Sequence, residues 1–333
     1  DQYGDEDALQ YESGWLRQVI KETAVNADGS FLSSRLKTIA QQSPYYYTRL
    51  EGDRAVTMSY GAYWRRLYED LPQQTDSKKE LDILWQDEFH GATLARDANR
   101  IASWVWVAGQ RPNGLCVPSS RSDMAEWQHN LSGELVTSGN PIPTIISHGH
   151  DIFDGGFVNY GCLHWTESSP LGEGEAEDVF AQHSIVFAAL PDNQTVVCLQ
   201  YAETTRRIYL PYIKGLGLKM PNDLFNDFKR KYTSQEGTVE LASCPDKEEI
   251  IKLKSSWLNI DDCLAVLTIY GDEYLTIYRP AERQIKIKGK PTLTSLYADE
   301  ICSVFKADKN IEPPNKVVID TAFMLMTGID AAS

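Results

Sequence analysis

The chain has 333 residues, 42% of them hydrophobic and 11% aromatic, a composition typical of a folded globular protein and not of a disordered or fibrous one. It carries 47 acidic and 32 basic residues, and the formal net charge of −15 disfavours general binding to nucleic acid or to an anionic membrane surface. The same charge counts against an acidic polysaccharide, unless arginine and lysine side chains gather locally in a groove. No run approaches the roughly 18 apolar residues of a membrane-spanning helix.

The first predicted element is a helix over residues 11–22, where apolar side chains recur at helical spacing. It lies in an N-terminal helical segment, residues 1–27. From residue 31 the pattern changes to short β-type runs that are bounded by turn residues. We therefore predict a β-supersandwich domain over residues 28–290 and a C-terminal β extension over residues 291–333.

Further short strands follow along the chain, with turn signals between several of them. One more helix is expected over residues 222–231, because Asp223 falls in its first turn and Arg230 and Lys231 fall in its last. The predicted strands cover residues 101–107, 184–190, 195–201, 207–212, 263–270, 274–278, 285–287 and 316–319. Many short strands and few helices predict a mainly β fold, an antiparallel supersandwich with a few short helices.

The six cysteines are widely spaced and include no CxxC pair. In a chain of this length they indicate isolated buried thiols rather than a disulfide framework or a zinc ribbon. The cysteines therefore leave the cellular compartment open.

The densest polar stretch runs from Arg121 to Asn130 and combines carboxylates, an imidazole, a carboxamide and an indole. Such a mixture suits a sugar site, in which Asp123 and Glu126 do acid–base chemistry and Asn130 neutralises a substrate carboxylate. The predicted substrate-binding residues are Trp104, Trp106, Arg121, Trp127 and His129, the indoles as stacking surfaces. The alternative is structural: a polar loop capping a helix that starts near Asp123, and tryptophans in a β core.

A second constellation contains four polar residues in the middle of the chain. His148 and His150 lie on one face of an extended segment, because side chains alternate with period two. With Glu167 and His183 downstream, they offer nitrogen and oxygen ligands of the kind that zinc accepts. The alternative is that these histidines are ordinary hydrogen-bonding residues.

The stretch SHGHDIFDGGFVNYG, residues 147–161, resembles the His-rich strand in the β domain of heparinase II/III-like polysaccharide lyases. By matching positions, the resemblance implies that His148 is catalytic and that His150 is a zinc ligand, with Glu167 and His183 as further ligands. PYYYTRLEGDRAV and LPDNQTVVCLQYA are placed as in the supersandwich that follows a helical toroid in several lyase families, including hyaluronate-lyase-like enzymes. The resemblance therefore also implies a helical catalytic domain or chain as a partner.

The predicted function is part of a polysaccharide-degrading enzyme, a lyase that cleaves uronate-containing glycans by β-elimination and is secreted or periplasmic rather than cytoplasmic. His148 is expected to act as base or acid, with Asn130 as the neutralising group. One alternative is a non-catalytic sandwich that binds a glycan or supports a catalytic domain. Another is a glycoside hydrolase using Asp123 and Glu126, although residues three apart on one helix rarely face each other across a substrate.

Overall fold

The computed structural model defines the fold over most of the chain after residue 82. The described residues are 83–109, 111–126, 129–139, 141–167, 178–222, 226–281, 286–287, 290–291, 297–307 and 310–330. The predicted N-terminal helix and Trp127 lie outside them, and the boundary predicted after residue 27 stays a prediction. The described elements are strands, with a single 3-10 turn at Ser122–Met124 among them. This confirms the mainly β, antiparallel fold.

The chain divides into two compact units. The larger one consists of Leu81–Pro221, Arg230–Ala281 and Ala298–Ser333. The smaller one includes Asn222–Lys229 and Glu282–Tyr297, and its described residues hold a short hairpin of β19 (Lys286–Ile287) and β20 (Lys290–Pro291). All the sites considered below lie in the larger unit.

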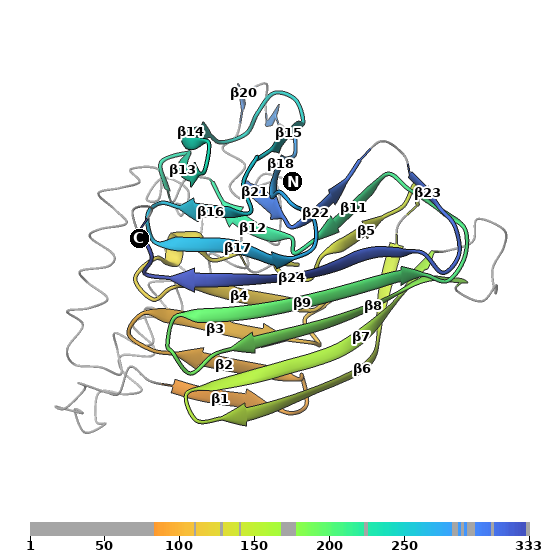
Figure 1. Cartoon of the computed structure of the whole chain (residues 1–333), viewed down its shortest axis with the longest axis horizontal. Coiled ribbons are helices and arrows are strands. Elements are labelled where there is room, and N and C mark those ends of the chain that lie inside the picture. Colours follow the sequence, from red (N-terminus) through yellow and green to blue (C-terminus); the bar gives the residue numbers. More distant parts are fainter. Residues whose placement is uncertain are drawn as a thin grey trace. The chain divides into compact units, whose positions relative to one another are not determined.

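The dominant element of the larger unit is a nine-stranded sheet in the order β14-β13-β16-β17-β24-β9-β8-β7-β6 (Figure 1). In β8, Ile185, Phe187 and Ala189 are buried while their neighbours are more exposed, the alternation of a strand with one face on a core. The strands are β6 (Pro141–Phe153), β7 (Gly156–Glu167), β8 (Asp178–Ala189), β9 (Thr195–Thr204), β13 (Lys229–Ser234), β14 (Gly237–Ala242), β16 (Trp257–Ile260), β17 (Leu264–Tyr270) and β24 (Val317–Thr327).

A four-stranded antiparallel sheet in the order β1-β2-β3-β4 covers one face of the large sheet. Its strands are β1 (Ile83–Asp87), β2 (Ala92–Arg96), β3 (Arg100–Val105) and β4 (Asn113–Pro118). β2 contacts β7, β3 contacts β8 and β4 contacts β24, and Figure 1 shows the two sets of strands overlying each other. The two sheets therefore form a β-sandwich with one shared core.

Smaller antiparallel sheets complete the larger unit. One has the order β22-β11-β5, one the order β12-β21-β18-β15, and a third pairs β10 with β23. Their strands are β5 (Glu134–Val136), β10 (Ile208–Leu210), β11 (Tyr212–Gly215), β12 (Leu218–Pro221), β15 (Glu249–Lys252), β18 (Thr276–Arg279), β21 (Ala298–Cys302), β22 (Val304–Lys306) and β23 (Asn310–Glu312). β5, β11, β12 and β21 carry Glu134, Lys214, Lys219 and Glu300, respectively.

The indoles of Trp104 and Trp106 belong to the sandwich core. They are 1% and 0% exposed, and their rings lie 5.4 Å apart, edge to face. Trp104 also packs 5.1 Å from the ring of Phe187 on the large sheet. Burying an aromatic side chain of this size contributes about 1.5–3 kcal/mol to folding. The predicted role of these two tryptophans as stacking surfaces for sugars is therefore wrong.

The helix predicted over residues 222–231 is also corrected, because β13 occupies Lys229–Ser234. In that strand Arg230, Tyr232 and Ser234 are buried and the residues between them are less so, which is the period of a strand. The six cysteines are free thiols; the prediction that they are buried holds for Cys116, Cys198 and Cys302, whereas Cys162, Cys244 and Cys263 are partly exposed. The described part of the chain contains no helix with the length and apolarity needed to cross a lipid bilayer.

Candidate functional site

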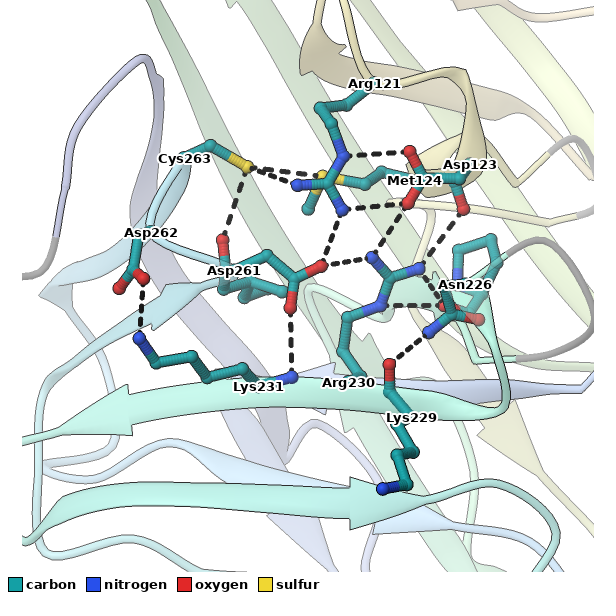
Figure 2. A network of polar contacts seen from close by, with 12 residues as sticks. Arg121, Asp123, Met124, Asn226, Lys229, Arg230, Lys231, Asp261, Asp262 and Cys263 are labelled. Carbon is teal, nitrogen blue, oxygen red and sulfur yellow. Dashed lines mark hydrogen bonds and ion pairs between the residues drawn. The ribbon is translucent and has the colours of Figure 1, made fainter. Parts of the chain in front are cut away.

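Arg121 and Asp123 belong to a network of ion pairs at the 3-10 turn (Figure 2). The guanidinium of Arg121 lies 2.9 Å from Asp123 and 2.7 Å from Asp261, and Arg230 bonds the same two carboxylates at 3.1 and 2.5 Å. Burial opposes ionisation of Asp123, but the two arginines outweigh it and hold its pKa below the usual value. These residues join distant segments of the fold, which differs from their predicted roles in acid–base chemistry and substrate binding.

Asn130 is 1% exposed, and its side chain is committed to the backbone. Its side-chain oxygen accepts a hydrogen bond from the backbone N–H of Lys219 at 2.8 Å, and the backbone N–H of Asn130 donates to the side-chain oxygen of Asn113 at 2.7 Å. Asn130 therefore fixes the loop before β5 against the start of β12. This placement is at odds with the prediction that it neutralises a substrate carboxylate.

His129, one residue earlier, is half-buried and adopts a left-handed backbone conformation with φ of 54°. Its Nδ1 atom is enclosed and has no hydrogen-bond partner among the described residues. Burial, together with the positive charges of Arg111 and Lys219, lowers the pKa of His129 to about 4. The imidazole is therefore neutral at pH 7 and able to accept a proton.

Two of the cations near His129 differ in how they are held. Arg111 donates to the carbonyl oxygen of Gly133 at 3.3 Å and forms an ion pair with Glu134 at 3.2 Å. Lys219 on β12 makes no ion pair with another described residue. Burial lowers the pKa of its ammonium group, with Arg111 acting in the same direction, and the negative charge of Glu300 opposes this without outweighing it. Glu126, the predicted acid–base residue, is half-buried, and its negative charge raises the pKa of Lys219. An unpaired cation beside a neutral imidazole favours an anionic ligand.

Glu134 on β5 anchors the site. Burial raises its pKa, but Arg111 and Lys214 outweigh this and lower the pKa to about 2. Its carboxylate lies 3.2 Å from Arg111 and 3.2 Å from the ammonium group of Lys214. Glu134 is therefore ionised throughout the physiological range and cannot serve as a proton donor there.

Lys214 on β11 lies in a nearly closed environment. Its ammonium group is 2.9 Å from Glu300 and sits 4.3 Å from the centre of the Tyr278 ring. Burial opposes its charge, but Glu300 and Glu134 outweigh burial and raise its pKa above the usual range. We refer to Arg111, His129, Glu134, Lys214 and Lys219 together as the cationic cluster.

The backbone around the cationic cluster is strained. Leu131 and Leu216 have φ of 61° and 68°, in the left-handed region that bulky residues rarely adopt. Leu131 donates its N–H to Gly217 at 3.0 Å, and Gln200 holds both loops through the carbonyl of Leu131 and the N–H of Leu216. Strained backbone held by surrounding bonds is typical of functional sites.

His148 is exposed on the edge strand β6. Its ring stacks on the buried indole of Trp106, with 6.2 Å between ring centres, and it lies over Gly91. The described contacts of His148 therefore connect it to the sandwich core. These contacts do not test its predicted catalytic role, which a comparison of His148→Gln with His129→Gln would decide.

The predicted zinc ligands are not brought together. His150 pairs with Asn159 on β7, and Glu167 lies eight residues further along the same strand, about 26 Å away. His183 is 0% exposed and stacks on Trp165 in the core, where burial lowers its pKa to about 3. Among the described residues no three His, Cys, Asp or Glu side chains lie close enough to hold a metal ion. The predicted ligand set therefore does not fit a zinc ion.

Four of the five residues of the cationic cluster were missed from the sequence, His129 being the exception. A signal for two of them exists in YIKGLGLKM, residues 212–220, where Lys214 and Lys219 interrupt an otherwise apolar stretch. Lysine is almost never buried unless it has a partner or a function. No local signal places Arg111 and Glu134 beside them.

No protein-family model and no curated protein sequence matches the chain. Among solved structures, the chain is similar to the galactosidase domain of the α-galactosidase-sucrose kinase AgaSK, with a TM-score of 0.43, 4% identity, and coverage of 74% of this chain and 42% of that one. The chain is also similar to the GH36 α-galactosidase AgaB from Geobacillus stearothermophilus, with a TM-score of 0.43, 5% identity, and coverage of 74% of this chain and 41% of that one. For YeaD from Salmonella typhimurium, a proposed mutarotase, the TM-score is 0.38 and the identity 10%, with coverage of 72% of this chain and 90% of that one.

The chain thus spans about two fifths of the length of either galactosidase. With TM-scores below 0.5, these likenesses leave its function to be inferred from its own residues.

Proposed function

We propose that the chain is the β-sandwich part of a polysaccharide-degrading enzyme, and that the cationic cluster binds a uronate-containing glycan and cleaves it by β-elimination. One observation carries the proposal: Arg111 and Lys219 both act on a neutral histidine in a chain of net charge −15. This is the local concentration of cations that an acidic sugar requires of an acidic protein.

The reaction assigns a separate task to each group. Arg111 and Lys219 bind the uronate carboxylate and stabilise the negative charge that develops on it when the neighbouring carbon loses its proton. His129 takes that proton, a carbon–carbon double bond forms, and the bond to the leaving sugar oxygen breaks. The imidazolium then returns the proton to the leaving oxygen. Glu134 and Lys214 act as positioning residues: Glu134 holds Arg111 at 3.2 Å, and Lys214 in turn holds Glu134 at 3.2 Å.

Binding of the substrate also makes His129 a better base. Its pKa of about 4 is lowered in part by Arg111 and Lys219. A uronate carboxylate between these cations offsets their charge, so the pKa of the imidazole rises in the complex. The base therefore gains strength where the substrate is present.

A helical partner domain or chain that extends the glycan-binding surface is part of this proposal, as is a secreted or periplasmic location. The test is calorimetric titration of the 333-residue chain with uronate tetrasaccharides from polygalacturonate, alginate and hyaluronan. Binding to at least one of them is expected, together with a loss of about tenfold or more in Lys219→Met. If none binds, or if the variant binds as the parent does, the proposal fails.

A further inference from the structure

The face of the nine-stranded sheet that points away from β1–β4 carries exposed tyrosine side chains. In β9, Gln200 and Ala202 are buried, whereas Tyr201 between them is 41% exposed. Tyr270 at the end of β17 is 60% exposed, and it shares this face because it pairs with Ala322 of β24. Exposed apolar side chains that form a contiguous patch mark binding surfaces.

Both tyrosine hydroxyls are fixed by carboxylates. The hydroxyl of Tyr201 donates to Glu203 at 2.9 Å, and that of Tyr270 donates to Asp320 at 3.2 Å. Side chains usually stand perpendicular to a sheet, but Glu203 lies two residues, about 6.6 Å, along the same strand. One or both of these side chains must therefore lean along β9. Because Tyr201 also pairs directly with Asp320, the two tyrosine–carboxylate pairs are neighbours.

A hollow of about 240 Å³ opens beside these pairs. Tyr270, Asp272, Lys306, Val317 and Asp320 are among the residues that line it. Val317 is 41% exposed, and the ammonium group of Lys306 donates to the carbonyl oxygen of Val318 at 3.3 Å, which leaves further donors. The hollow thus combines an aromatic wall, an apolar wall, two carboxylates and an ammonium group.

We propose that this hollow, together with Tyr201 and Glu203, is a second glycan-binding site that takes uncharged sugar units. Carboxylates accept hydrogen bonds from sugar hydroxyls, an ammonium group donates to them, and tyrosine rings pack on the apolar faces of sugar rings. The site lies on β9, β17, β22 and β24, and it shares no residue with the cationic cluster.

The local charge decides which sugars fit. Glu203, Asp272 and Asp320 give three negative charges against the single positive charge of Lys306, so a uronate carboxylate is repelled here. The cationic cluster has the opposite preference. The inference rests on the proposed function for its ligand class, and it sharpens that class to a glycan containing both acidic and uncharged sugars.

The experiment is affinity electrophoresis of the full chain in native gels containing galactomannan, xyloglucan, glycogen or polygalacturonate. At least one of the three uncharged polymers is expected to retard the protein. The double variant Tyr201→Ala/Tyr270→Ala is expected to weaken that retardation about tenfold. Phe89→Ala is the matched control, since Phe89 is an 83% exposed aromatic residue on the turn between β1 and β2 of the other sheet.

Thermal unfolding of each variant establishes that it is folded. The proposal is overturned if no uncharged polymer retards the parent chain, which is the result expected if this face binds another protein instead. It is also overturned if the folded double variant is retarded as strongly as the parent. If uncharged polymers retard both the parent and Lys219→Met, but the parent binds no uronate oligosaccharide, the second site is supported and the proposed function is refuted. If the parent binds a uronate oligosaccharide but no uncharged polymer retards it, the proposed function is supported and the second site is refuted.

Discussion

The ammonium group of Lys214 lies 2.9 Å from a carboxylate oxygen of Glu300, and the two residues come from β11 and β21, strands of different sheets. Both side chains are 9% exposed. A buried pair of this kind is costly to break, because removal of one partner leaves the other charge buried without compensation. The contact therefore couples the integrity of the cationic cluster to the packing of the two sheets.

Lys214→Met is accordingly expected to lower the free energy of unfolding by about 3–5 kcal/mol, since it leaves Glu134 and Glu300 without their shared cation. Urea unfolding followed by tryptophan fluorescence measures the loss. Lys247→Met, which removes an exposed lysine, is the control and is expected to change stability by less than about 0.5 kcal/mol. Equal effects of the two substitutions would contradict the assignment of Lys214 as a buried, ion-paired residue.

The network at the 3-10 turn allows a comparison between neighbouring residues of β13 (Figure 2). The side chain of Arg230 is 0% exposed and bonds Asp123 and Asp261, whereas Lys231 is 42% exposed and pairs with Asp262 at 2.5 Å. Arg230→Met is expected to cost about 3–5 kcal/mol of stability, and Lys231→Met at most about 1 kcal/mol. Chemical unfolding of both variants tests this, and a larger loss for the Lys231 variant would refute it.

Strands with a clear local pattern of β-branched and apolar residues could be predicted from the sequence. Runs of β-branched and apolar residues at 195–201 and 263–270 correspond to β9 and β17. The helix predicted over residues 222–231 failed because the charge pattern fits a helix, while burial of Arg230 and Tyr232 on one face of a strand depends on partners far along the chain.

The site was harder to predict than the fold. Arg111 and Lys214 are more than one hundred residues apart in sequence and come together only through Glu134 on β5, a three-residue strand. Trp104 and Trp106 are of a residue type that is common in sugar-binding surfaces, but both are buried in the sandwich core. Whether an aromatic side chain lies in a core or on a surface depends on which face of its strand meets the second sheet.

Stability is expected to fall as the pH is lowered below about 6.5. The folded state holds the pKa of His129 at about 4 and that of His183 at about 3, below the ordinary value of 6.5. At pH values between these lowered pKa values and 6.5, the unfolded chain binds more protons than the folded chain. The free energy of unfolding therefore rises with pH in this window, and the stability that the two neutral histidines contribute is lost as the pH decreases through it. Urea midpoints at pH 7.5, 6 and 5 measure the slope, and His129→Gln should make it shallower. An unchanged slope would contradict the lowered pKa of His129.

Removal of one cation should raise the pKa of His129. In Arg111→Gln the imidazole loses a neighbouring positive charge, so its NMR titration midpoint is expected to move upward from about 4. Arg207→Gln, which removes an exposed arginine, controls for the change in net charge and should leave the midpoint in place. A downward shift, or the same shift in both variants, would show that Arg111 does not act on His129.

The most direct test of the proposed reaction compares two histidines in one assay. The full chain is incubated with polygalacturonate, alginate and hyaluronan, and the ultraviolet absorbance of unsaturated uronate ends is recorded for the parent, His129→Gln and His148→Gln. We expect the parent to release such ends from at least one polymer, His129→Gln to lose this activity by about a hundredfold or more, and His148→Gln to retain it. No absorbance from the parent, or full activity in a folded His129→Gln variant, would contradict β-elimination at the cationic cluster.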